Sequence, residues 1–105
     1  MAWVYLLLAG VCEIGWPLGL KLGWSDKGIQ PLWLVLAGVA ILASGGLLML
    51  AQREIPMGAA YGVWTGIGAV GAFVVGIVLF GDAASTMRIV SILLITAGIV
   101  GLKMA

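Results

Sequence analysis

The sequence has no histidine and only one cysteine, Cys12. A lone cysteine cannot form an internal disulfide, and without histidine there is no His/Cys cluster with the spacing of metal ligands. Charge is scarce as well, since five basic and four acidic residues make up 9% of the chain and leave a net charge of +1. We expect no metal site, no cofactor and no nucleic-acid partner.

Apolar residues dominate what remains. Hydrophobic residues make up 64% of the 105 positions, and the mean hydropathy is +1.27. A soluble protein of this composition would leave apolar surface unburied, so the sequence predicts an integral membrane protein. Four apolar runs approach the ~20 residues that a spanning helix needs. They predict an all-α protein whose single transmembrane domain has four helices, at about 2–22, 31–51, 56–80 and 86–104. We expect it to be a multi-pass protein of the cell inner (plasma) membrane.

Short connections join the four runs. Pro31 and Pro56 fall where a helix begins, a position that tolerates the missing N–H, and Ser85 is expected to cap the fourth helix. The first run is too long for the core of a signal peptide and no basic leader precedes it, so we expect it to be retained as a helix. Connections this short leave no extramembrane domain, so we expect the protein to act inside the lipid bilayer.

A single acid, Glu13, interrupts the first run, ten residues after Trp3. Ten residues of helix rise about 15 Å, half of the ~30 Å hydrocarbon thickness, which places Glu13 near the bilayer midplane. A carboxylate is costly to bury there, and such acids usually line cavities or the pathways of protons and ions. Glu13 is therefore the leading candidate for a functional residue.

Helical spacing identifies the neighbours of Glu13 on the first helix. Gly10, Trp16 and Pro17 lie three or four residues away and share its face. Pro17 has no N–H to donate to the carbonyl of Glu13, so we expect the helix to kink there and to leave one backbone acceptor free. A kink of purely structural origin is the alternative.

Polar and aromatic residues of the second and third runs complete a candidate cavity. Ser44 is the only hydroxyl of the second run, and Tyr61, Trp64, Thr65 and Gly68 share one face of the third. By itself, Ser44 would be explained by a structural hydrogen bond between helices. Tyr61 and Trp64 add aromatic faces for a cation and hydrogen-bond donors for an acid, which favours a binding cavity.

The stretch Gly66–Gly71 matches the G-x-G-x-x-G pattern of dinucleotide-binding proteins. It lies inside an apolar run, without the preceding strand or the acid about twenty residues later that the pattern needs, so we reject nucleotide binding. Glycines of the third and fourth runs are instead expected to allow close helix packing or hinge motion. The candidates are Gly66, Gly68, Gly71, Gly98 and Gly101.

Charge in the connections gives almost no signal for orientation. With four spans, Arg53 and Lys103 lie on one side of the membrane, and Lys21, Lys27 and Arg88 lie on the other. This difference is too small for the positive-inside rule to fix one orientation. We therefore expect the chain to insert in both orientations and to pair as an inverted-topology dimer, an arrangement that many secondary transporters build from internal repeats. A single orientation, fixed by the N-terminus or by an unseen partner, is the alternative.

Taken together, these residues resemble the small multidrug resistance transporters, and within that family the guanidinium-exporter branch. The similarity extends along the whole chain, in Gly10 and Glu13 followed by Trp16 and Lys21, then Ser44, Ile55–Gly58, Tyr61, Val63–Ala69 and Gly98–Lys103. The resemblance implies an antiparallel homodimer in which both copies of Glu13 form one site, for either protons or a small cationic substrate. It also implies that Trp16, Ser44, Tyr61 and Trp64 position this acid, while transport exchanges two membrane-facing openings.

Four residues bear on the range of substrates. Trp16 together with Ser44 resembles the guanidinium branch, whereas the promiscuous quaternary-ammonium branch usually has other residues at these positions. Pro17 and Gly62 depart from the family, which more usually has a small non-proline residue and an alanine there.

We therefore expect a proton-coupled antiporter that exports guanidinium or small substituted guanidinium cations, and not an enzyme. A cation would bind Glu13 by displacing protons, so protons and substrate compete for one site. A promiscuous exporter of quaternary ammonium and other lipophilic cations is the alternative within the family. Two other classes stay open. A proton-carrying rotor subunit also keeps one mid-membrane acid but does not need the aromatic residues, and a non-transporting partner subunit leaves the acid unexplained.

Overall fold

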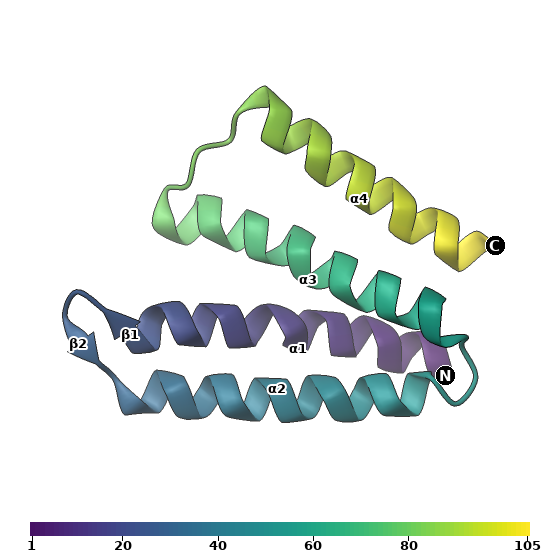
Figure 1. Ribbon diagram of the computed structural model, residues 1–105, viewed down its shortest axis with the longest axis horizontal. Coiled ribbons are helices and arrows are strands. Elements are labelled where there is room, and N and C mark those ends of the chain that lie inside the picture. Colours follow the sequence, from purple (N-terminus) through teal and green to yellow (C-terminus); the bar gives the residue numbers. More distant parts are fainter.

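The computed structural model describes all 105 residues as four long helices with one short hairpin between the first two (Figure 1). The elements in order are α1 (Ala2–Gly23), β1 (Trp24–Ser25), β2 (Gly28–Ile29), α2 (Pro31–Ala51), α3 (Met57–Phe80) and α4 (Thr86–Met104). All four helices are long and apolar enough to cross a membrane. The all-helical membrane class expected from the sequence is confirmed.

Proline and serine set the helix starts. Pro31 is the first residue of α2, where its missing N–H has no helical partner in any case. Pro56 is the N-cap of α3 rather than its first residue, so α3 begins at Met57. Ser85 caps α4 as expected, because its hydroxyl accepts a hydrogen bond from the N–H of Arg88 at 3.4 Å.

The first connection holds a hairpin that the sequence did not reveal. Trp24 pairs with Ile29 and Ser25 pairs with Gly28 in an antiparallel ladder. Gly28 has φ of 100°, a conformation that favours glycine. Strands of two residues are too short to show an alternating pattern, so only a turn could be expected here.

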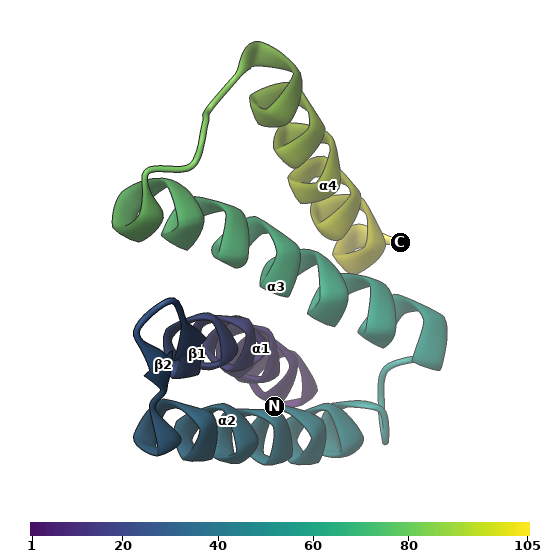
Figure 2. The ribbon, with the colours of Figure 1, turned by 60° about the vertical axis from the view of Figure 1, so that its left-hand side comes forward.

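The helices lie in a row, in the order α2, α1, α3, α4 (Figure 1). Figure 2 shows that α4 approaches α3 near the C-terminus and diverges from it toward the connection between them. The molecule measures 45 × 34 × 16 Å, so it is a flat slab rather than a closed bundle. Only 15 of 105 residues are buried and none of them lies in α4, which leaves both faces of the row open to lipid or to another chain.

The small core lies at the end of the molecule that holds the N-terminus, where α1 and α3 begin and α2 ends. Leu6 of α1 and Val63 of α3 are fully buried at its centre. Small residues of three helices and the α2–α3 connection close around them, namely Ala2, Ala51, Ile55 and Ala60. This contact fixes α3 against α1 at one end and so positions the middle of both helices, where Glu13 lies.

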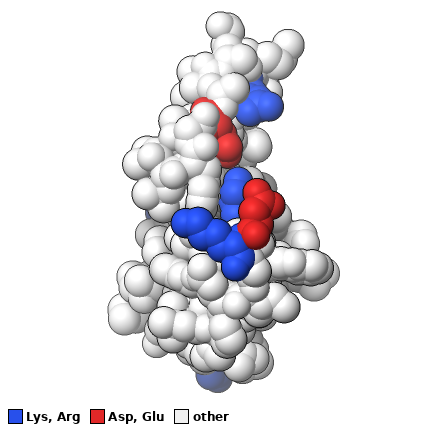
Figure 3. Space-filling view, turned by 90° about the vertical axis from the view of Figure 1, so that its left-hand side faces the viewer, with Lys and Arg blue, Asp and Glu red and all other residues white.

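Charged side chains of both signs gather at the opposite end of the molecule (Figure 3). This end holds the hairpin and the α3–α4 connection (Figure 1). Its charged residues in the sequence are Lys21, Asp26, Lys27, Asp82 and Arg88. Charge is thus placed where the helices would leave the hydrocarbon, and Glu13 alone lies deep within the span.

Candidate functional site

Glu13 lies in the middle of α1, which begins at Ala2 and ends at Gly23. Its half-buried side chain lines an open hollow of about 220 Å³ between α1 and α3. A Cβ at Gly68 of α3 would lie only 2.6 Å from Cγ of Glu13. Glycine at this position therefore lets the stem of the acid lie directly against α3.

A chain of hydrogen bonds joins the acid to α2 and α3. Trp64 donates from Nε1 to Oγ of Ser44 at 2.7 Å. The Ser44 hydroxyl lies 2.7 Å from the carbonyl oxygen of Ala9 and 3.3 Å from Oε2 of Glu13, and both are acceptors. A hydroxyl has one hydrogen, so it donates to one of the two at a time.

Ser44 is fully buried, so this choice of acceptor is made in a water-free setting. Trp64 occupies one lone pair of the hydroxyl and thereby directs its hydrogen toward the two acceptors on α1. A hydrogen bond to an ionised carboxylate is about twice as strong as one to a neutral group. The hydroxyl can therefore turn toward Glu13 when the acid is ionised and toward the Ala9 carbonyl when it is not.

Tyr61 lies on α3 one turn before Trp64. The two ring centres are 5.4 Å apart, and the planes are tilted by 50°. Tyr61 is 55% exposed, so its ring extends the aromatic surface outward from the buried hydrogen bond. The pair thus forms an aromatic wall in which the Trp64 N–H is already bonded to Ser44, while the Tyr61 hydroxyl is free to bind a ligand.

Thr65 lines the hollow at Glu13, although the sequence did not mark it as a site residue. Its hydroxyl donates to the backbone carbonyl of Tyr61. Gly68, Ala69 and Ala72 continue the same face at helical spacing. That spacing of small residues was the available signal, but it becomes informative only once this face of α3 is known to meet Glu13.

The remaining predicted site residues of α1 are placed differently. Pro17 lines the hollow. The helix α1 continues past Pro17 without interruption as far as Gly23. Gly10 packs against α3, since a Cβ there would lie 2.7 Å from the side chain of Ile67. Trp16 is half-buried and is not among the residues that line the hollow at Glu13.

The predicted packing glycines also fall into two groups. Gly66 faces Ile99 of α4, and Gly71 faces Ile14 of α1 so closely that an added Cβ would overlap the Ile14 side chain. Gly98 and Gly101 of α4 have open space before them within the protomer.

An acid in the middle of an apolar helix, hydrogen-bonded to a buried hydroxyl and open to a hollow, is typical of membrane transporters. The family comparison agrees, because residues 1–95 match the model of the Small Multidrug Resistance protein family. The chain belongs to this family. It is a multi-pass transporter of the inner membrane.

Relatives with closely similar sequences are named for their substrate. The guanidinium exporter of Yersinia pseudotuberculosis is 50% identical over 105 residues, which are 100% of this chain and 99% of the relative. The guanidinium exporters of Citrobacter freundii and Escherichia coli (strain K12) are 46% and 45% identical over 105 residues, covering 100% of this chain and 98% of each relative.

Proposed function

We propose that this protein is a proton-coupled antiporter that exports guanidinium or small substituted guanidinium cations, and that protons and substrate compete for Glu13. The observation that carries the proposal is the geometry of that acid. Glu13 is open to a hollow on one side, and Oε2 lies 3.3 Å from the Ser44 hydroxyl on the other. One carboxylate can neutralise either a proton or a cation, so the two ligands exclude each other.

This competition couples proton and cation transport if the site opens to the other side of the membrane only when a proton or a cation is bound. A proton entering from one side and a cation leaving from the other then exchange through the same acid. Ser44 supports the exchange because its hydrogen can move between Glu13 and the Ala9 carbonyl, so neither state leaves the hydroxyl without an acceptor.

Guanidinium fits this site by shape and by donors. Its planar N–H groups match a carboxylate in a two-point hydrogen bond, and its face can lie on an aromatic ring. Trp64 and Tyr61 carry such rings on α3, one residue and four residues before Thr65, which lines the hollow. The names of the three relatives point to the same cation.

We further propose that two copies pair in opposite orientations, as an antiparallel homodimer. A single copy is a slab that leaves the hollow at Glu13 open. An acid facing hydrocarbon is costly, so a second copy laid over this face would enclose both acids in one cavity. The near balance of charge between the two ends permits insertion both ways.

Transport into liposomes tests the proposal with a matched pair of variants. Glu13→Gln keeps the size of the side chain and removes its charge and titration, so proton-driven guanidinium uptake should be abolished. Glu54→Gln makes the same change in the exposed α2–α3 connection and should leave uptake unchanged. Retained uptake in Glu13→Gln would refute the proposal. Tetramethylammonium, assayed alongside, should be carried poorly, and preference for it would favour the quaternary-ammonium alternative.

A further inference from the structure

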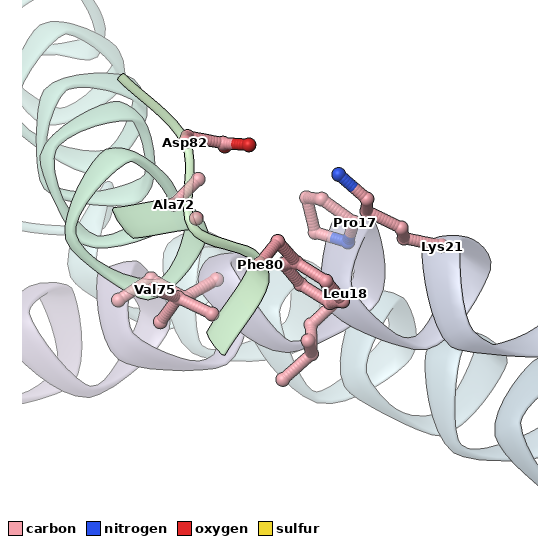
Figure 4. A pocket seen from close by; sticks show the side chains of 9 residues that line it. Pro17, Leu18, Lys21, Ala72, Val75, Phe80 and Asp82 are labelled. Carbon is pink, nitrogen blue, oxygen red and sulfur yellow. The ribbon is translucent and has the colours of Figure 1, made fainter. Parts of the chain in front are cut away.

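A second hollow lies between α1 and α3, toward the charged end of the molecule (Figure 4). Its volume is about 190 Å³, and it shares Pro17 and Ala72 with the hollow at Glu13. The two hollows are therefore neighbouring parts of one groove. A cation that approaches Glu13 along this groove passes the second hollow first.

Asp82 contributes a carboxylate to this second hollow. Gly81 ends α3 in the left-handed conformation, with φ of 67°, and the N–H of Asp82 donates to the carbonyl of Gly76 at 3.1 Å. The carboxylate folds back into the space that a side chain at Gly76 would occupy. The end of a helix already carries partial negative charge, so an acid placed there forms a strongly negative corner that attracts a cation.

Lys21 supplies a cation to this corner in the structure. Its Nζ lies 4.3 Å from the centre of the Phe80 ring. Figure 4 shows the amine and the Asp82 carboxylate pointing toward one another across the hollow. Phe80 thus already holds a cation on its face. Lys21 is exposed and reaches this place on a flexible side chain, so it can withdraw when another cation arrives.

We propose that Asp82 and Phe80 form an outer cation site, which Lys21 occupies at rest and which a guanidinium-type substrate occupies before it moves to Glu13. The inference rests on the proposed function, because it concerns the path to the same acid. A planar guanidinium can lie on the Phe80 ring while its N–H groups face the carboxylate. In an antiparallel dimer, each copy would present its outer site to the opposite side of the membrane.

Binding to the outer site can be observed without transport. The chain has two phenylalanines, Phe73 and Phe80, so labelling with 4-fluorophenylalanine gives two fluorine signals, which a Phe73→Leu variant assigns. In the Glu13→Gln protein, which lacks the inner acid, guanidinium should shift the Phe80 signal more than the Phe73 signal. Adding Asp82→Asn should remove this difference. Equal shifts of both signals, or a Phe80 shift that survives Asp82→Asn, would overturn the proposal.

Transport kinetics test whether the outer site lies on the path. Asp82→Asn should raise the KM for guanidinium about two- to fivefold at an unchanged maximal rate, as expected for loss of one exposed charge contact while the Phe80 ring stays in place. Asp26→Asn removes the same charge from the hairpin at the same end and should leave KM unchanged. Equal effects of these two variants would show that only the general surface charge matters, and would overturn the proposal.

The Lys21→Met variant distinguishes a cation-binding site from a purely structural contact between Lys21 and Asp82. It removes the resident cation, so KM should fall, opposite to the effect of Asp82→Asn. If the two residues only clasped α1 to the end of α3, both variants would change KM in the same direction, and the proposal would be wrong. A wild-type protein that carries no guanidinium would refute the proposed function instead, and the fluorine titration would then decide the outer site alone.

Discussion

Replacing Gly68 by alanine perturbs the position of Glu13 without changing any polar group. The added Cβ would lie 2.6 Å from Cγ of Glu13 and 3.3 Å from its Cβ. Carbon atoms in contact are separated by about 3.5–4.0 Å, so Cγ has to move by about 1 Å. The Ser44 hydroxyl is 3.3 Å from Oε2, already long for a hydrogen bond between oxygens, so such a displacement should break it.

The expected result is weaker binding in a folded protein. One net hydrogen bond contributes about 1 kcal/mol, which corresponds to roughly fivefold weaker guanidinium binding. The helix itself should tolerate the change, because alanine is about 1 kcal/mol more favourable than glycine in a helix interior. Calorimetric titration of the purified transporter with guanidinium measures the affinity, and circular dichroism on heating checks the fold.

Gly58→Ala is the matched control on the same helix. Its added Cβ would contact no neighbouring side chain within 4 Å. Affinity should therefore stay at the wild-type value. The reasoning fails if Gly68→Ala binds guanidinium as the wild type does, or if both variants lose affinity equally.

Three further outcomes are expected. Guanidinium and protons should compete for binding, because a proton on Glu13 removes the counter-charge of the cation, and guanidinium binding that releases no protons would show that this acid is not the site. Reporters fused to the C-terminus should appear on both sides of the membrane, and extra lysines in one connection should favour one orientation, whereas a fixed orientation that ignores added charge would contradict dual insertion. Pro17→Ala should weaken guanidinium binding more than tetraalkylammonium binding, by the ~1 kcal/mol of one hydrogen bond. Proline leaves the Glu13 carbonyl free to accept a hydrogen bond, and guanidinium has N–H groups to donate whereas a tetraalkylammonium has none. Equal losses for both cations would show that the proline only shapes α1.

Several features of the site were predictable because they depend on one helix at a time. Bilayer thickness sets the length of an apolar run, and a lone acid inside such a run stands out whatever surrounds it. Helical spacing places Pro17 on the face of Glu13, and both residues do line one hollow. The same rule put Gly10 and Trp16 on that face, but it could not show that Gly10 packs against Ile67.

Contacts between helices were beyond the reach of the sequence. The hydrogen bond from Trp64 to Ser44 joins residues 20 positions apart on different helices, and its geometry depends on how each helix is rotated about its axis. Periodicity fixes which residues share a face of one helix, but it does not fix which face meets which neighbour.

The sequence by itself determined that this chain has four membrane-spanning helices and one acid in the middle of the first, because hydrophobic length and the cost of a buried charge are local properties. Only the tertiary structure decided that Ser44 bridges Trp64 and Glu13, that Gly68 admits the acid against α3, and that Asp82 and Lys21 line one hollow. Each of these depends on the packing of separate helices at close range, where a shift of an ångström changes which side chains can touch.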